Sequence, residues 1–339
     1  MNLNNYGIIP NVENRDGIPA RITAQHKEWY EIVCQYGLTY ARLKASAYYQ
    51  GTELFPTVGD YVMVNFIENG DSQILATLPR RTFFTRRDPG PIPRVQAVAA
   101  NFDYVFILQS LNQNFNPKRL ERYLTLAWQS GAVPVILLTK ADLVTEYQDF
   151  LNQTERVAPG VDVHILSAKM GFGLEGLAPY LQSGKTAVFL GSSGVGKSSL
   201  VNALAGEEIM SVSGIRDDGR GRHTTTHRQL ILLSSGVMII DTPGMRELGM
   251  WEASSGLSDA FADVERFLGK CRFSDCRHDR EPGCAIKAAL ASGELDAVRW
   301  ESYQKLQEEA MSREELLRHK REWLKEVSRY NRQRKKDNR

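Results

Sequence analysis

The chain lacks the two features that direct a protein into or across a membrane. Its longest apolar runs, such as residues 133–138, are far shorter than the roughly 20 residues that a membrane-spanning helix needs. Residues 1–17 do not join a basic start to an apolar run, as a signal peptide does. Internal repeats and low-complexity segments are also missing. These absences predict a cytoplasmic protein with no membrane partner.

Cysteine is scarce and unevenly distributed. Of four cysteines, Cys34 stands alone and three lie between Cys271 and Cys284. Clustered cysteines in a reducing compartment favour a metal site over a disulfide framework.

The chain also has little net charge. Its formal charge is +2, so overall charge identifies no polyanionic partner. Residues 318–339 differ, because ten of them are basic and three are acidic. This basic segment fits RNA or another phosphate-rich surface as well as it fits a solvated end of the chain.

A chain of 339 residues can form two or three domains, and its pattern changes at two points. Residues 18–80 contain five short strand-like segments without a helical period. They predict a small closed barrel of the OB type, with another small β-barrel or β-sandwich as the alternative. Three prolines within residues 89–93 cannot continue a regular element. We therefore assign the N-terminal tail and barrel to residues 1–88.

Residues 89–250 alternate apolar strands with helical stretches. Several strands are apolar almost throughout, as a sheet covered on both faces requires, and the pattern predicts a doubly wound α/β domain. Residues 251–339 are mostly helical, apart from the segment with the clustered cysteines. The expected strands of the α/β domain are residues 103–110, 133–140, 161–168, 186–192, 229–235 and 237–243.

One segment of the α/β domain matches the phosphate-binding pattern G-x-x-x-x-G-K-[ST], between a strand and a helix-forming sequence. Small residues let backbone N–H groups converge on phosphate oxygens at the start of the helix. Lys197 would contact the β- and γ-phosphates, and the Ser198 hydroxyl would bind Mg²⁺. The residues expected to contact the phosphates are Gly191, Ser192, Ser193, Gly194, Val195, Gly196, Lys197, Ser198 and Ser199.

A metal-binding carboxylate and a mobile loop are expected beyond this motif. Asp241 ends an apolar strand and begins the sequence Asp-Thr-Pro-Gly, so it is placed to hold Mg²⁺ through water. Gly244 leaves a bare N–H for the γ-phosphate. The polar, glycine-rich residues 217–230 contain three successive threonines, 224–226, any of which could complete the Mg²⁺ shell. We assign this role to Thr225, although the sequence does not decide among the three.

Two further segments, Thr-Lys-Ala-Asp and Ser-Ala-Lys, follow strands and together fit a guanine site. Guanine presents N1–H and an exocyclic amine side by side, and one carboxylate can accept both, whereas adenine has no such pair. Asp142 would accept them, the stem of Lys140 would cover the purine face, and the Ala168 N–H would reach guanine O6. Thr-Lys-Ala-Asp alone would be an ordinary solvated strand end, but with the other motifs it predicts selection of GTP. The expected base-binding residues are Thr139, Lys140, Ala141, Asp142, Ser167, Ala168 and Lys169.

Guanine sites more often have Asn at the position that Thr139 occupies in this chain. An Asn amide can both contact the base and brace the phosphate loop, whereas a Thr hydroxyl has fewer hydrogen-bonding sites. Guanine specificity should therefore rest mainly on Asp142, with somewhat weaker nucleotide affinity.

The base-binding motifs precede the phosphate loop, which reverses the usual order. A parallel sheet can be cut in one connection and rejoined in another without moving any strand in space. Residues 89–250 are therefore predicted to form a circularly permuted P-loop GTPase domain, with the motifs in the order G4-G5-G1-G2-G3.

Four potential metal ligands lie within fourteen residues, in the pattern C-x4-C-x-H-x5-C. Cys271, Cys276, His278 and Cys284 form the Cys₃His set that structural Zn²⁺ sites use. A closed four-ligand site leaves no open position for catalysis, so one Zn²⁺ would hold a loop-rich segment together. Residues 251–339 are thus expected to form a helical zinc-binding domain, with reduced, unligated cysteines as the alternative.

The whole series of motifs resembles the ribosome small subunit-dependent GTPase A (RsgA/YjeQ) family. The resemblance covers nearly the whole chain, from the barrel through TKAD, SAK, GSSGVGKS, GRHTTT and DTPGM to the cysteine pattern. It implies a bacterial cytoplasmic GTPase that binds the 30S ribosomal subunit and its 16S rRNA during late maturation. Slow intrinsic hydrolysis of GTP to GDP and phosphate would be stimulated by the subunit. We expect the chain to act as a monomer.

The group that orients the attacking water is not the usual one. Many small GTPases place Gln shortly after the glycine of this motif, but Met245 follows Gly244 here and its side chain cannot orient water. The resemblance implies that His223 replaces it as a catalytic residue, while Lys197 and Mg²⁺ stabilise charge during in-line attack. Alternatively, His223 binds RNA or orders its loop, and His227 is a weaker candidate.

Two other functions remain compatible with parts of the sequence. One is a nucleotide-gated protein-interaction switch whose barrel and zinc domain hold proteins, with hydrolysis incidental. The other is an ATP-dependent kinase, which Asp142 and Ser-Ala-Lys disfavour. OB barrels bind oligonucleotides and oligosaccharides alike, so the barrel does not decide between partners. The arginines that would add phosphate contacts beside the barrel are Arg80, Arg81, Arg86 and Arg87.

Overall fold

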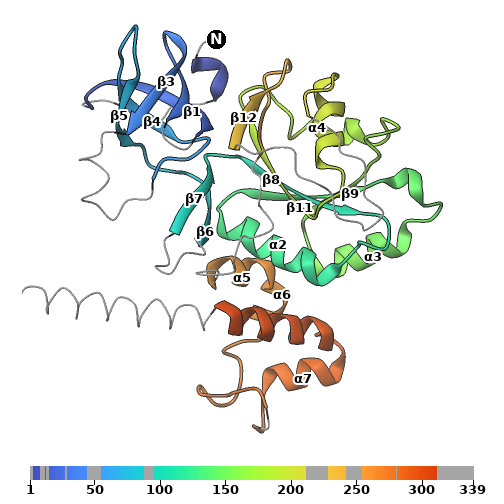
Figure 1. The fold of residues 1–339 in the computed structure, drawn as a ribbon. Helices are drawn as coiled ribbons and strands as arrows, with labels where there is room; N and C mark the ends of the chain where they lie inside the picture. The colour runs from blue at the N-terminus through green and yellow to red at the C-terminus, as the bar shows by residue number, and fades with distance from the viewer. Residues whose placement is uncertain are drawn as a thin grey trace, which may run out of the picture. The chain divides into compact units, whose positions relative to one another are not determined.

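The computed structural model describes two compact units, one within Met1–Gly249 and one within Met250–Arg339 (Figure 1). None of the helices in the described part of the chain has the length and apolar character needed to span a membrane. The described residues are 3–7, 12, 15–26, 29–43, 55–87, 95–210, 228–241, 254–279 and 281–310.

The first unit begins with a closed five-stranded barrel. β1 pairs with both β2 and β4, and β3 pairs in parallel with β5, so the order β1-β2-β3-β5-β4 returns to β1. Side chains that alternate along the strands, among them Ile22, Ile32 and Ile74, are fully buried in its core. The expected OB-type barrel is therefore confirmed. Its strands are β1 (Ile18–Gln25), β2 (Tyr30–Cys34), β3 (Gly37–Leu43), β4 (Tyr61–Asn65) and β5 (Ser72–Thr77).

A two-stranded hairpin follows the barrel, formed by β6 (Phe83–Arg87) and β7 (Val95–Ala100). Neither strand was predicted, because the proline-rich residues 88–94 between them interrupt any strand pattern. Those residues, with the domain boundary expected near Pro89, lie outside the described part of the chain. The buried ring of Phe84 stacks on Phe102, with 4.9 Å between centroids, and thereby attaches the hairpin to the α/β region.

The α/β region contains a sheet of six strands in the order β10-β9-β8-β11-β13-β12. The first five are parallel and β12 is antiparallel to β13. Helices α2 and α3 lie on one face and α4 on the other (Figure 1), and Leu200 of α4 joins a core cluster with Phe106 and Leu137. All six expected strands are present. The elements are β8 (Tyr104–Ser110), α2 (Pro117–Gln129), β9 (Val133–Thr139), α3 (Gln148–Val157), β10 (Asp162–Ile165), β11 (Thr186–Gly191), α4 (Lys197–Ala205), β12 (Arg228–Leu232) and β13 (Met238–Asp241).

Strand β12 joins the barrel to the α/β sheet. It pairs with β13 on one side and with β1 on the other, where Ala24 lies opposite Gln229, so that one sheet of eleven strands runs through both. Arg21 of β1 is buried at this junction and donates hydrogen bonds to the Asn101 carbonyl and the Thr186 hydroxyl, at 2.9 and 3.1 Å. Because a buried cation is stable only when its donors are satisfied, these bonds fix the barrel against the α/β region.

The second unit is mostly helical, as expected. Arg299 has 5% of its surface exposed and donates to both carboxylate oxygens of Asp263 at 3.0 Å. Its guanidinium also lies 3.9 Å from the centroid of the Phe261 ring. Arg299 therefore docks the helix formed by residues 297–310 against the first helices of this unit. Those helices are α5 (Ser254–Ala260) and α6 (Ala262–Glu265), and α7 (Ala285–Ser292) follows the clustered cysteines.

Candidate nucleotide site and metal centre

The phosphate-binding motif forms a loop between β11, in the middle of the sheet, and α4. Gly194 and Gly196 have φ angles of 68° and 106°, a backbone conformation that residues with a Cβ atom rarely adopt. Gly196 is the N-cap of α4, so the helix begins at Lys197. The positive end of the α4 dipole and its first backbone N–H groups therefore lie at this loop.

Lys197 is held against the loop that it follows. Its ammonium group donates to the carbonyl oxygens of Gly191 and Ser192, both at 2.9 Å. These bonds keep the cation beside the loop, which is the position from which it can reach a phosphate. Ser198 is the next residue of α4 and is partly exposed.

The other candidate segments lie at the same edge of the sheet as this loop. In the parallel register, Gly191 pairs with Leu108, while Ser110 pairs with Thr139. β10 runs parallel to β9, and β13 runs parallel to β11. The segments that follow these strands therefore emerge together at the carboxyl edge, with the base-binding motifs on one side of β11 and Asp241 on the other.

Thr139 connects the base-binding segment to the phosphate loop. Its side chain is 3% exposed, and its hydroxyl donates a hydrogen bond of 2.6 Å to the carbonyl of Val195. A hydroxyl has one proton, so this bond occupies its only donor. Thr139 thus braces the loop and has no second donor for the base.

The two base-binding segments contact each other directly. The Ser167 hydroxyl donates to Asp142 Oδ1 at 2.5 Å, and the Ala141 N–H donates to the Leu166 carbonyl at 3.2 Å. Lys140 adopts a left-handed conformation that starts the turn. Beside Asp142 lies a pocket of about 560 Å³, within the range of small-molecule sites. It is lined by Ala141, Asp142, Leu143, Tyr147, Ser167, Lys169, Met170 and Phe172.

Several predicted site residues lie outside the described part of the chain. They belong to the loop before β12 or to the segment after Asp241. Asp241 itself is described, partly buried, as the last residue of β13. The residues outside are His223, Thr225 with its neighbours Thr224 and Thr226, His227, Gly244 and Met245.

Two residues at this edge were missed by the sequence interpretation. Asn114, in the loop after β8, donates to the Ser192 hydroxyl at 2.9 Å, and Arg119 of α2 donates in turn to Asn114. No motif marks either residue. The only signal was the spacing of Asn112, Asn114 and Asn116 directly after a strand that ends at this edge.

One arginine expected to add phosphate contacts has a different role. Arg80 donates to both carboxylate oxygens of Asp60 at 2.7 Å, and the Asp60 side chain is fully buried. Removing Arg80 would leave an unpaired buried carboxylate, so this ion pair belongs to the barrel's structure. Arg81 lies 4.0 Å from Asp103 and is exposed.

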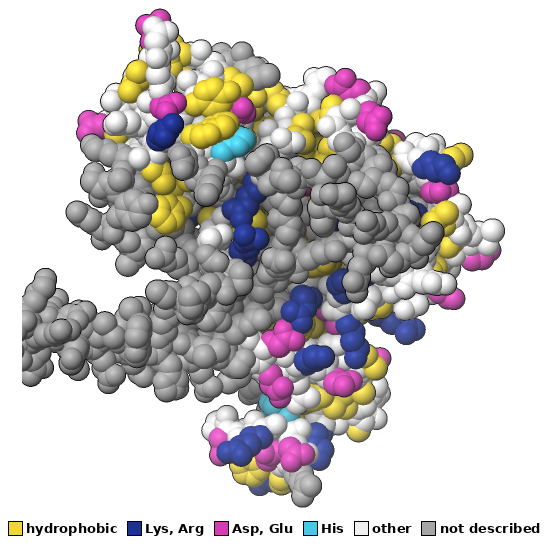
Figure 2. Space-filling model, viewed as in Figure 1, with side chains coloured by type: hydrophobic (Ala, Val, Ile, Leu, Met, Phe, Trp, Pro, Cys, Tyr) yellow, Lys and Arg dark blue, Asp and Glu magenta, His cyan; other side chains and the backbone are white. Residues whose placement is uncertain are grey.

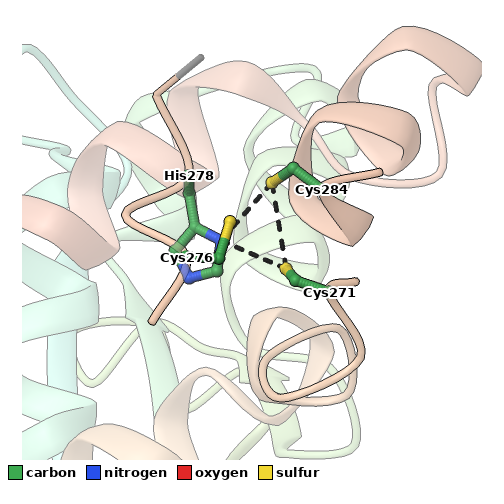
Figure 3. A group of neighbouring side chains, drawn as sticks. All are labelled: Cys271, Cys276, His278 and Cys284. Atoms are coloured by element: carbon green, nitrogen blue, oxygen red, sulfur yellow. Dashed lines mark hydrogen bonds between the residues drawn. The ribbon is translucent and has the colours of Figure 1, made fainter. Parts of the chain in front are cut away.

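The second unit gathers the four predicted metal ligands (Figure 3). Their ligand atoms all lie within 4.8 Å of one another. His278 Nδ1 is 3.4 Å from the sulfurs of Cys271 and Cys284, which are 3.9 Å apart. Sulfur ligands at about 2.3 Å around a tetrahedral Zn²⁺ would be separated by about 3.8 Å. The cluster is thus a Cys₃His set of the size and chemistry that a zinc ion requires.

Local backbone structure positions these ligands. Cys284 is the N-cap of α7, and the Ala285 N–H donates to Cys271 Sγ at 3.3 Å. This hydrogen bond is the main cause of a lowered pKa of the Cys271 thiol, and it favours the thiolate that binds metals. His278 has a φ of 62°, and its ring meets the edge of Trp300 with 5.7 Å between centroids. The ligands are therefore held by the fold of this unit.

Comparison with known proteins agrees with these features. A family model described as RsgA GTPase matches residues 77–251. The small ribosomal subunit biogenesis GTPase RsgA 2 of Listeria monocytogenes serotype 4b (strain F2365) is 47% identical over 291 residues, which cover 85% of this chain and 82% of the relative. The protein of the same name from Lactiplantibacillus plantarum is 43% identical over 91% of this chain and 89% of its own length.

Solved structures give the same result at the level of the fold. The chain is similar to YjeQ from Thermotoga maritima, with a TM-score of 0.64 and 27% identity over 85% of this chain and 96% of that one. It is also similar to YloQ, described as a circularly permuted GTPase, with a TM-score of 0.59 and 25% identity over 90% and 99% of the two chains. The chain therefore belongs to the RsgA GTPase family, and it is a circularly permuted GTPase.

Proposed function

We propose that this GTPase assists late maturation of the small ribosomal subunit and that the subunit accelerates its slow hydrolysis of GTP. Relatives that share 43–47% of its sequence are named as small ribosomal subunit biogenesis GTPases. The observation that carries the proposal is the assembly, at one sheet edge, of the phosphate loop, the Asp142–Ser167 pair and Asp241. The 30S subunit and its 16S rRNA would be the partners of a cytoplasmic monomer.

The phosphates of GTP would lie on residues 191–199, at the start of α4. Backbone N–H groups of the loop would bind their oxygens, and Lys197 would leave its carbonyl acceptors to reach the β- and γ-phosphates. Asp241 ends β13, and Ser198 lies in the helix that follows the neighbouring parallel strand β11. Hydroxyl and carboxylate oxygens suit Mg²⁺, and Thr225 is a third candidate ligand. Bound Mg²⁺ would neutralise charge on the phosphates.

The guanine would lie beside Asp142. The Asp142 carboxylate accepts one hydrogen bond from Ser167 and keeps further acceptor sites for guanine N1–H and the exocyclic amine. Lys140 and Lys169 would flank the purine, and the Ala168 N–H would contact its O6. Thr139 and Ala141 would hold this segment in place, because each donates a hydrogen bond to a backbone carbonyl of a neighbouring segment.

Hydrolysis requires a water molecule in line with the γ-phosphate. Met245 cannot orient water, so slow turnover of the isolated protein is expected. We assign the orienting role to His223 in the loop before β12, and contact with the γ-phosphate to the N–H of Gly244. The small subunit would order this loop and so complete the catalytic arrangement.

The remaining parts of the chain would hold the ribosome. The barrel exposes large apolar side chains, among them Tyr36, Leu38 and Tyr40, and yellow patches are visible on it in Figure 2. The tyrosine rings suit stacking on RNA bases. The described part of the second unit mixes basic and acidic side chains (Figure 2), so the basic residues 318–339, outside the described part, would supply most phosphate contacts there. One structural Zn²⁺ would hold the Cys₃His segment.

The domain boundaries follow from the same assignment. We place the tail and barrel at residues 1–88, the permuted GTPase domain at 89–250 and the zinc-binding helical domain at 251–339. The division into compact units at Gly249 is the main support for the second of these boundaries.

Binding to purified small subunits separates this function from a protein-interaction switch. We expect binding that is stronger with a non-hydrolysable GTP analogue than with GDP. The association constant should fall steeply as the salt concentration rises, because cationic side chains displace ions from RNA phosphates. Binding that does not depend on salt would favour a protein partner instead.

A further inference from the structure

We infer that Asn114, oriented by Arg119, is a positioning residue that fixes the phosphate loop at Ser192. The inference rests on the proposed role of residues 191–199 as the phosphate site. It concerns the loop between β8 and α2, which carries no nucleotide-binding motif.

The hydrogen bonds define the orientation of the Asn114 side chain. Arg119 Nη2 donates to the backbone carbonyl of Asn114 and, at 3.2 Å, to its Oδ1. Because Oδ1 is thereby the acceptor, Nδ2 faces Ser192 and donates to its hydroxyl oxygen at 2.9 Å. Both of these hydrogen bonds from Nη2 end on Asn114, and Arg119 Nε has no partner among the described residues.

The loop that carries Asn114 is itself well supported. Asn112 Oδ1 accepts from the Ser110 hydroxyl at 2.9 Å and from the Asn114 N–H at 3.0 Å. Asn116 caps α2 by accepting from the Arg119 N–H at 3.0 Å, and Pro117 begins the helix. A loop with these bonds can hold Asn114 in one place without help from a ligand.

Ser192 is a useful point at which to hold the phosphate loop. Its carbonyl is one of the two acceptors that retain Lys197. The loop is also braced from β9, where Thr139 donates to Val195. Two side chains from different segments thus fix its second and fifth residues. A loop ordered before binding loses less conformational entropy when phosphate arrives, so both braces should increase nucleotide affinity.

This role predicts a specific kinetic pattern for Asn114→Ala. Loss of one hydrogen bond should weaken binding of GTP and of GDP alike, by about two- to tenfold. KM for GTP should rise by a similar factor while subunit-stimulated kcat stays close to wild type, since Asn114 does not contact the reacting atoms. The preference for GTP over ATP should not change, because that preference depends on Asp142.

The test is a double-mutant cycle in the full chain, using the dissociation constants of GTP and GDP. Asn114→Ala, Ser192→Ala and the double variant are compared, with thermal melting of each. The Asn114 substitution should weaken binding in the wild-type background and have no further effect when Ser192 is alanine. Gln113→Ala, exposed in the same loop, should bind as the wild type does. Asn114→Leu keeps the size of the side chain but cannot hydrogen-bond to Ser192. It should weaken binding as well, which keeps the inference testable if the alanine variant melts early.

Two results would overturn the inference. One is unchanged affinity in both Asn114 variants, and the other is additive losses in the double variant, since additivity means that Asn114 does not act through Ser192. Failure of the wild-type protein to bind GTP would instead contradict the proposed function.

Discussion

Thr139 is expected to affect the strength of nucleotide binding without defining which base is bound. Its hydroxyl proton is used on the Val195 carbonyl, inside the protein. An asparagine at this position would carry two N–H donors and one oxygen, so it could brace the loop and contact the base together. We therefore expect recognition of guanine to depend mainly on Asp142, whose carboxylate is exposed at the pocket.

Thr139→Asn should accordingly bind GTP more tightly than the wild type, by roughly two- to tenfold if one hydrogen bond is gained. Thr139→Val is the matched control, because it keeps the shape, removes the brace and should bind more weakly. The dissociation constants of both variants for GTP can be measured by titration with a fluorescent GTP analogue. An asparagine variant that binds no more tightly than the wild type would contradict this account of Thr139.

His223 should matter for turnover and not for binding. His223→Ala is expected to keep its affinity for GTP but to lose most of the stimulation by small subunits, since an alanine cannot orient water. Single-turnover hydrolysis with subunits present measures this, and His227→Ala provides the comparison within the same loop. Undiminished stimulated turnover would remove His223 from the mechanism.

Elements with strong local patterns could be predicted from the sequence, and those fixed by distant contacts could not. The strands of the α/β sheet are apolar runs of strand length, and all six lie where that pattern places them. The hairpin of β6 and β7 was missed, because its strands are short and separated by prolines. The pairing of β1 with β12 joins residues about 200 positions apart, and no local pattern encodes such a contact.

The distinction between local patterns and distant contacts also applies to the candidate nucleotide site and to the Cys₃His cluster. That Asp142 and Lys197 lie at one edge of the sheet agrees with the motifs that contain them, and their roles toward guanine and phosphate stay predictions. The contact of Asn114 with Ser192 could not be predicted, since it comes from the position of one loop beside another. The Cys₃His cluster was predictable because its four residues lie within fourteen positions, whereas the contact of Trp300 with His278 arises only from the folded unit.

The cysteine-bearing segment should depend on its metal as a single element. We expect about one zinc per chain in the purified protein, and Cys276→Ser should lower this content sharply and make residues 271–284 sensitive to protease. Cys34→Ser is the control, because Cys34 lies in the barrel core and is remote in sequence from the cluster. Elemental analysis with limited proteolysis measures both effects. A purified protein that contains no zinc and resists chelators would show that the cysteines are unligated.

Strand β12 directly connects the candidate nucleotide site of the first unit to the barrel. It begins immediately after the loop that contains His223, and it pairs with both β13, which carries Asp241, and β1 of the barrel. The Arg228 side chain donates to Gln25 of β1 at 3.1 Å and to the carbonyl of Ala97 at 3.2 Å. A conformational change of that loop on GTP hydrolysis would therefore act on β12, which is hydrogen-bonded to the barrel strand β1.

Circular permutation determines which flanking domains are connected to the segments that are expected to sense the γ-phosphate. The base-binding strands come first, so the chain leaves the GTPase region through β13 and its Asp-Thr-Pro-Gly sequence. In the sequence, that segment leads directly into the unit with the Cys₃His cluster, while the loop before β12 leads into a strand paired with the barrel. Both flanking domains are thus connected in sequence or by hydrogen bonds to segments that would sense the γ-phosphate.

GTP turnover with and without purified small subunits is the decisive measurement for a GTPase that responds to the small ribosomal subunit. We expect slow release of phosphate from GTP alone, stimulation of at least about tenfold by the subunits, and no comparable turnover of ATP. Lys197→Ala should abolish both the basal and the stimulated rate. Equal rates with and without subunits, or equal hydrolysis of ATP and GTP, would contradict the account.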